Sequence, residues 1–394
     1  MTLFIGVDIA KDTHYAAMTN QHGEILIEAF PFKNTSEGFN LFLSAVMEQS
    51  SNTNDLLVGF ESTAHYAENF SYFLDQHSIS YILLNPLETS SLRKQRIRIT
   101  KTDSIDAPLI AQALCLHLYN KHKHVMKRSR NNAELYSLCS SRHNLMDMRT
   151  KCKIQFVAFM DRLFPELSMF FGGNLHLNTV YSIIDKYPSA HKIAKVRIDT
   201  LAKLIEEASH GRFKKDKAEE LKKLAKASVG IKSSAFELQA QLAVNQIRLY
   251  TEQIKSIDLE IERMVNDTET TLLSVPGLST NSIGVILSVT DNFSNFDSPC
   301  KVLAYSGLDP IVNQSGKWKA QRTRMSKRGN SLLRYTLILA ADNVRKHDST
   351  FASYYLKKRQ EGKTHYCALG HCAGKLIRVL FKLVKSNTNY ESQE

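Results

Sequence analysis

The chain has 394 residues, of which 43% are hydrophobic and 23% are charged. Because single hydrophobic cores stop growing at roughly 250–300 residues, this length predicts two or more domains, and the composition excludes wholesale disorder. No apolar run approaches the roughly 18–20 residues of a membrane span, and the N-terminal sequence lacks the pattern of a secretory signal. We therefore expect a folded cytoplasmic protein with no membrane partner.

Positive charge is concentrated at the C-terminal end of the chain. The whole sequence has 51 Lys+Arg and 39 Asp+Glu, a net charge of +12. Residues 301–394 contain 18 basic and 6 acidic residues, so this last quarter accounts for the whole excess. The basic residues are interleaved with Ser, Thr, Gly and aromatic residues and form no amphipathic membrane-type stripe. This distribution predicts nucleic-acid binding, with a basic surface that has no partner as the alternative.

The six cysteines are scattered without the spacing of a disulfide framework, as expected in a reducing compartment. One local cluster, His365, Cys367, His371 and Cys372, holds four potential soft metal ligands within eight residues. Its spacing matches no standard zinc motif, and a helix would turn Cys372 away from the others. We expect ordinary helix packing there, with a metal site as the alternative.

The first 120 residues alternate strand-like and helix-like runs. Strand-like runs predict strands at 3–9, 15–19 and 24–32, and two short runs are typical of buried strands at 56–60 and 79–84. Helical spacing predicts helices at 37–47, 66–76 and 102–118. The first three strands should form an antiparallel meander. The later alternation of strands with helices predicts an α/β sheet.

From residue 131 to residue 271 the pattern changes to long helices. The stretch 234–267 contains neither Gly nor Pro, and its apolar residues recur every three to five positions, which predicts a helical hairpin or coiled coil. The residues of this predicted seam are Leu238, Leu242, Ile247, Tyr250, Ile254, Ile257, Ile261 and Met264. The Lys-rich segment 213–226 alternates in charge sign, which is typical of a solvated helix face.

Four carboxylates occupy positions that favour a shared site. Asp8 lies in the apolar strand FIGVDIA, where a carboxylate costs stability unless it is paired, exposed or bound to a cation. Glu61 ends the strand LLVGFE, and Asp103 and Asp106 are three residues apart at the start of a helix. Such an oxygen-only cluster suits Mg²⁺ or Mn²⁺. The alternative is structural, because acids in a first helical turn are favoured by the helix dipole anyway.

Three serines near the C-terminal basic residues are candidate nucleophiles. Ser315 precedes Gly316 in a loop, which favours an exposed hydroxyl that a phosphate can approach closely. Ser326 and Ser331 rank almost equally on the residues alone, although Ser331 is placed for the N-terminal region of a helix. The surrounding basic residues are candidate phosphate contacts, with simple solubility as the alternative: Lys317, Lys319, Arg322, Arg324, Lys327, Arg328 and Arg334.

The motifs in this order resemble those of a known family. GVDIAK, FESTAHY, NP and KTDSIDA are similar to the RuvC-like DEDD domain of insertion sequence 110 family transposases, which are associated with bridge RNAs. The family also includes Piv-type DNA invertases. SVPGLS, FSNFDSPCKVLAYSGLDP and NQSGKWKAQRTRMSKRGNSLLRYTLILAA resemble that family's transposase domain. The resemblance covers residues 1–120 and 270–390, and the helices between them match only as a longer coiled-coil linker.

The resemblance implies three domains. The first, residues 1–125, is a RuvC-like (RNase H-like) α/β catalytic domain. The second, residues 126–270, is a long helical linker with a coiled coil. The third, residues 271–394, is a mainly α, basic transposase domain that carries the serine nucleophile.

The resemblance also assigns roles to residues and partners. It implies that Asp8, Glu61, Asp103 and Asp106 bind Mg²⁺ or Mn²⁺, and that Ser315 attacks DNA to give a phosphoserine intermediate before strand exchange. Gly316 and the basic residues around it would contact nucleic acid. The implied partners are donor and target DNA, a structured guide RNA, and further copies of the chain arranged as a dimer of dimers.

The leading hypothesis is therefore an RNA-guided insertion-sequence transposase. A site-specific DNA invertase without guide RNA is the alternative within recombination. A RuvC-type junction-resolving nuclease would use the same four acids but would leave no covalent adduct. A non-catalytic nucleic-acid-binding protein would use these acids only for helix capping and at sheet edges.

Overall fold

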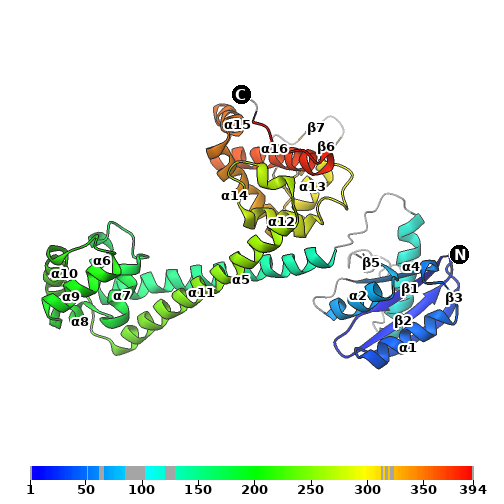
Figure 1. Cartoon of the computed structure of the whole chain (residues 1–394), viewed down its shortest axis with the longest axis horizontal. Helices are drawn as coiled ribbons and strands as arrows, with labels where there is room; N and C mark the ends of the chain where they lie inside the picture. Colours follow the sequence, from blue (N-terminus) through cyan, green and yellow to red (C-terminus); the bar gives the residue numbers. More distant parts are fainter. Residues whose placement is uncertain are drawn as a thin grey trace. The chain divides into compact units, whose positions relative to one another are not determined.

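The computed structural model describes residues 2–50, 52–61, 66–84, 103–119, 129–311, 314–315, 318–319 and 324–392 (Figure 1). For some of these, among them Asp103, Ser315 and Lys319, only the backbone is described. The chain divides into two compact units. The first contains residues 1–130 and 290–302, and the second contains residues 131–289 and 303–394.

A five-stranded mixed sheet forms the first unit. Its strands are β1 (Leu3–Asp8), β2 (Thr13–Thr19), β3 (Ile25–Lys33), β4 (Leu56–Glu61) and β5 (Ser80–Leu84). They lie in the order β3-β2-β1-β4-β5, with antiparallel pairing among β1, β2 and β3 and parallel pairing from β1 through β4 to β5. The predicted meander and α/β sheet are confirmed.

Helices cover both faces of this sheet. They are α1 (Ser36–Met47), α2 (Tyr66–Gln76) and α4 (Asp103–Tyr119), and the short 3₁₀ helix η1 (Thr53–Asp55) precedes β4. Side chains from α1 and α2, including Phe42 and Phe70, pack with alternate residues of β1 and β4 in one buried cluster. Side chains of α4 pack on the opposite face with Phe4 and Leu57. Successive side chains of a strand point to opposite faces, so each strand serves both layers.

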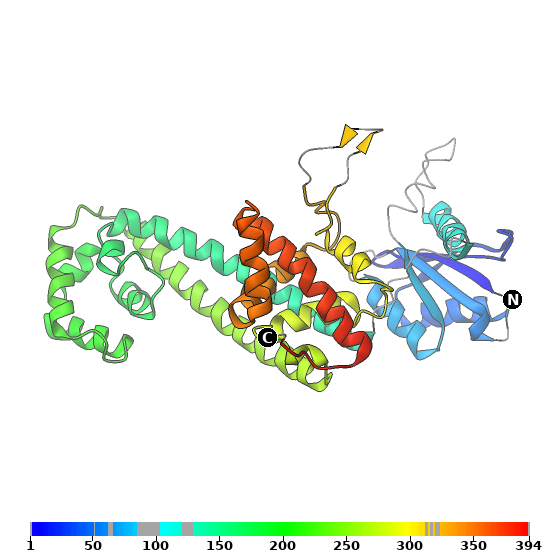
Figure 2. The same cartoon turned by 90° about the horizontal axis from the view of Figure 1, so that it is seen from above.

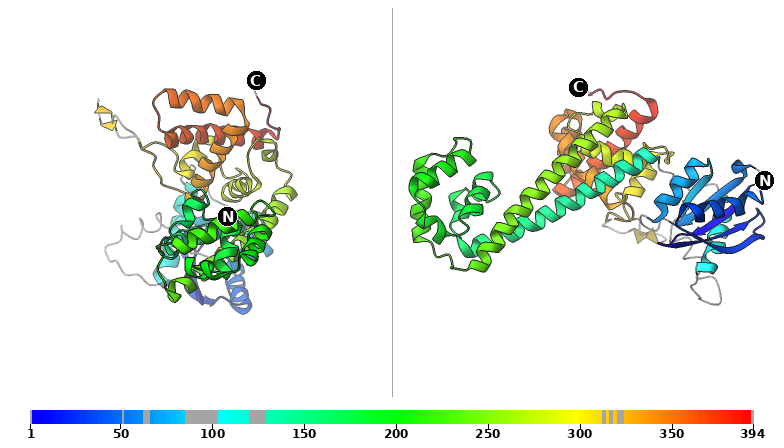
Figure 3. Two further views of the ribbon diagram at one scale, coloured as in Figure 1. Left: turned by 90° about the vertical axis from the view of Figure 1, so that its left-hand side faces the viewer. Right: turned by 60° about the horizontal axis from the view of Figure 1, so that its bottom comes forward.

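A pair of long antiparallel helices begins the second unit: α5 (Arg130–Leu163) and α11 (Ser234–Asp267) (Figure 3, right). Three side-chain hydrogen bonds join them, from Arg142 to Asp258, from Arg149 to Thr251 and from Cys152 to Gln246. As the residue number rises along α5 it falls along α11, which defines the antiparallel direction. Helix α11 coincides with the predicted helical stretch 234–267, and α5 is its antiparallel partner.

The seam of α11 differs in part from the prediction. Ile247, Ile254 and Ile261 are buried as expected, but Leu238 and Leu242 are 56% and 50% exposed, so their assignment to the seam was wrong. The buried face of α11 is instead completed by small and branched residues, among them Ala240, Ala243, Val244 and Val265. These residues continue the three-and-four spacing of the isoleucines, and that spacing directs Leu238 and Leu242 outward.

Between α5 and α11 the chain forms a compact bundle of short helices, here called the distal bundle (Figure 2). Its helices are α6 (Leu167–Phe170), α7 (Asn178–Lys186), α8 (Ala190–Lys195), α9 (Ile198–Ala208) and α10 (Lys215–Ala227). They share one hydrophobic core with the adjoining ends of α5 and α11. The bundle therefore has its own buried interior.

The C-terminal part of the chain is mainly helical. Its elements are η2 (Thr271–Ser274), α12 (Thr280–Thr290), α13 (Pro299–Ser306), β6 (Gln314–Ser315), β7 (Trp318–Lys319), α14 (Ser331–His347), α15 (Ser349–Gln360) and α16 (His365–Ser386). The C-terminal tail is tied down, because Asp348 accepts hydrogen bonds from the hydroxyls of Tyr390 and Ser392 at 2.8 and 2.9 Å. Among the helices of the described residues, none is both long and apolar enough to span a membrane.

Candidate functional site

Asp8 and Glu61 end two neighbouring parallel strands. The parallel register pairs Val7 of β1 with Phe60 of β4, so the next residue of each strand is one of the two acids. Val7 and Phe60 belong to the cluster beneath α1 and α2. By strand alternation, Asp8 and Glu61 lie on the opposite face, the one that α4 covers. Both side chains are half-buried.

Helix α4 runs antiparallel to β1 across this face. Phe4, near the start of β1, packs with Ile110 and Leu114. Gly6, two residues further along, lies against the backbone of Ala107 and Ala111. Residues later in β1 therefore lie against residues earlier in α4, which means that the two elements run in opposite directions. The first turn of α4, which carries Asp103 and Asp106, therefore extends toward the end of β1 where Asp8 lies.

Glycine sets the close approach of this helix to the sheet. A Cβ atom at Gly6 would lie 2.2 Å from both the Ala107 carbonyl oxygen and the Ala111 nitrogen. These neighbours are backbone atoms that cannot rotate away, so position 6 has room for glycine only. Gly59, the register partner of Gly6, faces the Leu114 side chain, with its nearest atom at 3.0 Å from an added Cβ. The sequence signal for both positions was a glycine inside an apolar strand.

The predicted metal-binding tetrad is described only in part. Asp106 is buried, with 3% exposure, and the side chain of Asp103 lies outside the described residues. Among the described side chains, no three His, Cys, Asp or Glu residues form a group that could hold a metal. The donor set nevertheless suits a hard divalent cation, because all four residues offer carboxylate oxygens.

Ser315 is the last residue of β6, a two-residue strand that pairs with β7. Gln314 lies opposite Lys319, and Ser315 lies opposite Trp318. The side chain of Ser315 is outside the described residues, so its role stays a prediction. The predicted contact residues Gly316, Lys317 and Arg322 also lie outside the described residues, as do the motif NP at 85–86 and the KT of KTDSIDA at 101–102.

Two short stretches of chain on either side of Ser315, residues 309–311 and 324–326, are joined by hydrogen bonds and are here called the stem. The Ile311 amide donates to the Arg324 carbonyl at 2.8 Å. The Ser326 amide donates to the Asp309 carbonyl at 2.8 Å, and the Ser326 hydroxyl donates to the Asp309 carboxylate at 2.5 Å. The sequence pattern did not reveal this pairing, because its members are 17 residues apart in no regular element.

The base of this stem is closely packed. The Lys327 amide donates to the Gly307 carbonyl at 3.0 Å, and the Asn330 amide donates to the Tyr305 carbonyl at 2.9 Å. Gly329 has a φ of +119°, and an added Cβ there would lie 2.1 Å from the Tyr305 oxygen. The two chain segments of the stem are therefore held at a separation that only glycine permits.

The predicted phosphate contacts fall into two groups. Arg324, Lys327 and Arg328 are exposed on or next to the stem. Arg334 is half-buried, and its guanidinium donates to the carbonyl oxygens of Ser306 and Lys327 at 3.0 and 3.2 Å. The Arg334 side chain thus binds the backbone of the stem itself, while its contact with nucleic acid stays a prediction.

The other two candidate serines have distinct environments. The hydroxyl of Ser326 is engaged by Asp309, as described above. Ser331 is the exposed first residue of α14, directly after the N-cap Asn330, whose side chain accepts from the Leu333 amide at 2.9 Å. Placement of Ser331 at the N-terminal region of a helix is confirmed.

The His/Cys cluster at the start of α16 is not assembled as a metal site in the described residues. Cys372 is fully buried, whereas Cys367 is exposed. His365 shares a 2.8 Å hydrogen bond with the Tyr355 hydroxyl. His371 is exposed, and partial desolvation together with the nearby charges of Lys358 and Lys363 lowers its pKa. Of the four residues only Cys372 is packed in the helix interior, so the helix-packing expectation is met at that residue alone.

Two family models match the chain. Residues 5–165 match a DEDD-type IS110 model described as "Transposase". Residues 269–356 match a model described as "Transposase IS116/IS110/IS902 family". Together these ranges cover more than half of the sequence, and they leave the distal bundle between them.

Curated relatives agree with these models. A 43.6 kDa protein of insertion element IS110 from Streptomyces coelicolor is 22% identical over 296 residues, 74% of this chain and 73% of the relative. The pilin gene-inverting protein of Moraxella lacunata is 20% identical over 397 residues, 99% of this chain and 98% of the relative. A 44.8 kDa protein of insertion element IS116 from Streptomyces clavuligerus is 27% identical over 38% of each chain. The chain therefore belongs to the IS116/IS110/IS902 family of transposases, which are enzymes of DNA recombination.

Proposed function

We propose that the chain is the recombinase of an insertion sequence, that it uses Ser315 as the nucleophile on DNA, and that Asp8, Glu61, Asp103 and Asp106 bind Mg²⁺ or Mn²⁺. The observation that carries this proposal is the placement of Asp8 and Glu61 at the same end of adjacent parallel strands, on the face where α4 begins. Asp103 and Asp106 belong to the first turn of α4, in the same unit as the two strands.

The sheet supports a RuvC-like (RNase H-like) assignment for the first unit. Three antiparallel strands followed by two parallel ones, in the order β3-β2-β1-β4-β5, place the first strand at the centre. The central strand then presents its terminal acid between its neighbours. We extend the proposal to the linker, where α5 and α11 pair as a coiled coil, and to the three domains 1–125, 126–270 and 271–394.

Membership of a DEDD-type family implies the use of a divalent metal. A cation held by the four acids would neutralise charge on the scissile phosphate and on the oxygen that leaves. The protein's part is to hold the carboxylates on rigid elements. Two lie on hydrogen-bonded strands, and two lie on a helix whose distance from the sheet is fixed by Gly6.

The proposed reaction is a transesterification. The Ser315 oxygen forms a bond to phosphorus as the bond from phosphorus to the DNA 3′ oxygen breaks. The serine hydroxyl loses its proton, and the departing 3′ oxygen takes up a proton as it leaves with the bonding electrons. The phosphoserine ester conserves the bond energy, so a second 3′ hydroxyl can reverse the reaction and join a new strand without ATP.

Charged residues around Ser315 are proposed to bind the DNA backbone. Arg324, Lys327 and Arg328 are exposed beside the stem, and Gly316, Lys317, Lys319, Arg322 and Arg334 complete the predicted set. Lysine and arginine contacts to phosphate position the duplex without reading its sequence. We therefore propose that target choice lies with a structured guide RNA, and that the chain acts on donor and target DNA as a dimer of dimers.

A second candidate is a site-specific DNA invertase that needs no guide RNA. The observation that favours it is the match to a pilin gene-inverting protein over 99% of this chain. Sequencing of nucleic acid that copurifies with the full chain separates the two, because a guided enzyme retains one discrete RNA species and an unguided invertase does not.

The tetrad is tested by cleavage of duplex DNA with and without Mg²⁺. We expect Asp8→Asn and Glu61→Gln each to lower strand cleavage by at least about 100-fold, since each removes a charged metal ligand. Glu28→Gln, an exposed carboxylate on β3 of the same sheet, is the matched control and should retain activity. Normal cleavage by both tetrad variants would instead favour a structural role for these acids.

A further inference from the structure

The distal bundle lies between the two matched ranges of the family models, residues 5–165 and 269–356. It nevertheless carries a charge imbalance of its own. From the start of α6 to the end of α10, residues 167–227 contain twelve Lys+Arg and seven Asp+Glu, an excess of five positive charges. This excess needs a physical explanation, because concentrated positive charge on a folded unit repels itself unless a polyanion is bound.

Three lysines of the bundle form ion pairs with its carboxylates. Lys203 pairs with Glu207 at 4.0 Å, Lys215 with Asp199 at 3.0 Å and Lys217 with Glu220 at 2.8 Å. These paired lysines are Lys203, Lys215 and Lys217. Their carboxylate partners are no longer available to balance charge elsewhere.

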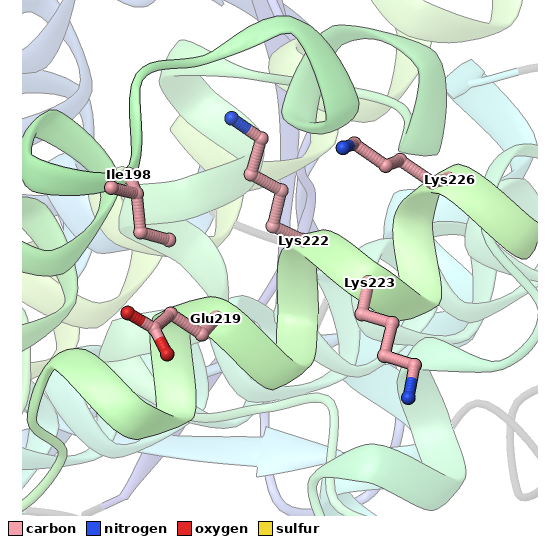
Figure 4. Close-up of a pocket in the computed structure, with 5 residues that line it drawn as sticks. All are labelled: Ile198, Glu219, Lys222, Lys223 and Lys226. Atoms are coloured by element: carbon pink, nitrogen blue, oxygen red, sulfur yellow. The ribbon is translucent and has the colours of Figure 1, made fainter.

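A second set of lysines projects from the other half of α10. Lys222, Lys223 and Lys226, here called the α10 lysine face, line an open pocket of about 300 Å³ together with Ile198 and Glu219 (Figure 4). Within the described part of the chain, none of the three ammonium groups has a carboxylate within 4.0 Å. In Figure 4 the ammonium groups of Lys222 and Lys226 lie on one side of α10 and that of Lys223 lies on the other, while all three side chains line the pocket.

The fold holds this face in place. Leu221 and Ala225 are buried in the core of the bundle, which turns Lys222 and Lys226 outward one helical turn apart, a rise of roughly 6 Å. The Lys222 ammonium donates to the Val196 carbonyl at 2.5 Å, across the gap between α10 and the end of α8. This bond fixes the position of the Lys222 charge without neutralising it.

The chemistry of the pocket fits phosphate groups better than bases. Its lining offers three ammonium groups against one carboxylate, that of Glu219, and it has no aromatic ring on which a base could stack. Lysine acts as a point charge toward phosphate and gives no base discrimination. Duplex DNA is a regular polyanion, and its successive phosphates can each pair with one of the lysines that are spaced one turn apart on a rigid helix.

We propose that the α10 lysine face binds the phosphodiester backbone of duplex DNA, as a sequence-independent contact separate from the residues around Ser315. Its role is to hold a length of DNA, and it needs no chemistry at Ser315. The inference thus goes beyond the proposed function and does not depend on it.

The test is a mobility-shift titration of the full chain with a duplex DNA of about 60 base pairs at several salt concentrations. The variant is Lys222→Gln/Lys223→Gln/Lys226→Gln. The matched control is Lys203→Gln/Lys215→Gln/Lys217→Gln, which removes the same charge from the same bundle but at the paired lysines. We expect the variant to raise Kd about tenfold at 0.1 M salt and to reduce the salt slope by about two to three, whereas the control changes Kd by less than about threefold.

Two further variants protect the test against misfolding. Lys223→Gln/Lys226→Gln leaves the Lys222 bond to Val196 intact and should show about two thirds of the slope change. Lys222→Arg/Lys223→Arg/Lys226→Arg should restore binding, because the charge is retained. Equal affinity for DNA in the triple Gln variant and the matched control would overturn the proposal, and so would a loss of affinity confined to duplex RNA. Formation of the Ser315 adduct at saturating DNA should stay unchanged in the triple Gln variant, so this result is distinguishable from failure of the proposed nucleophile.

Discussion

The Ser326 hydroxyl donates a 2.5 Å hydrogen bond to the carboxylate of Asp309, and the backbone of the same two residues is joined by a 2.8 Å bond. The two residues flank the segment that carries Ser315, one on each side. Hydrogen bonds to a charged acceptor are stronger than those between neutral groups. This pair therefore closes the stem at the point where the segment leaves the helical part of the unit.

The first prediction concerns that pair. We expect Ser326→Ala to reduce the covalent protein–DNA adduct about tenfold, because a hydrogen bond to a charged group contributes about 1.5–3 kcal/mol and its loss loosens the stem. The adduct that remains should still map to Ser315. Ser326→Thr keeps a hydroxyl and should restore adduct formation. Quantitative gel analysis of the adduct makes the comparison.

Ser331→Ala is the control for this prediction. Its hydroxyl is exposed, and the helix is capped by Asn330 rather than by Ser331, so adduct formation should be unchanged. If Ser326→Ala removed the adduct completely while Thr failed to restore it, Ser326 would be the better candidate for the nucleophile.

The second prediction concerns the contact between α4 and the sheet. Gly6→Ala would bring a Cβ within 2.2 Å of two backbone atoms of α4, so the helix must move away from β1. Overpacking of this kind costs about 1–3 kcal/mol or more, and it also displaces Asp103 and Asp106. We expect a lower melting temperature together with a loss of Mg²⁺-dependent cleavage.

Gly59→Ala provides a graded comparison for Gly6→Ala. The Cβ at position 59 would meet only the end of the Leu114 side chain, at 3.0 Å, and that side chain can move. We expect a smaller fall in melting temperature than for Gly6→Ala. Equal effects of the two substitutions would show that the glycine contact at β1 does not set the position of α4.

The third prediction concerns pH. His14 is fully buried, its Nδ1 accepts from the Ala10 amide at 3.2 Å, and burial lowers its pKa below 6.5, an effect that the Asn34 side chain partly opposes. The folded chain therefore keeps the ring neutral, whereas the unfolded chain protonates it below about pH 6.5. The contribution of His14 to the free energy of unfolding is fully present above the pKa that the ring has in the unfolded chain. It is lost as the pH falls toward the lower folded pKa, by at most about 1.4 kcal/mol per pH unit.

Hydrogen exchange of the β1 and β2 amides, corrected for intrinsic rates, measures this effect. The free energy of opening should fall between pH 7 and pH 5 by more in the natural chain than in His14→Gln, which cannot be protonated. Parallel pH dependence in the two proteins would mean that His14 is not the group responsible.

Much of the first unit could be predicted from the sequence, because each strand or helix is indicated by residues that are close together in the chain. Short runs of apolar residues mark β1, β2 and β4, and the position of Asp8 and Glu61 at the ends of two of these runs follows from the same pattern. The face that Asp8 and Glu61 share could also be inferred, since successive side chains of a strand point to opposite faces of the sheet. Burial of Gly6 against α4 could not, because it depends on a helix 100 residues away.

The helical parts show why periodicity alone is insufficient. Leu238 and Leu242 are apolar and helically spaced, yet they lie on the outer face of α11, since Ala240 and Val244 provide the buried surface. Sequence alone also could not show which lysines of segment 213–226 form ion pairs and which do not. Its alternating signs are typical of a solvated face, but among the described residues Lys215 and Lys217 form ion pairs and the α10 lysine face forms none within 4.0 Å.

In the proposed reaction Ser315 becomes covalently bonded to DNA. The most direct measurement is mass spectrometry of the full chain after reaction with duplex substrate and Mg²⁺, followed by proteolysis and nuclease digestion. We expect a nucleotide phosphate attached to the peptide that contains Ser315, and no adduct in Ser315→Ala. Strand exchange by Ser315→Ala at the rate of the natural chain, or an adduct found on another residue, would contradict it.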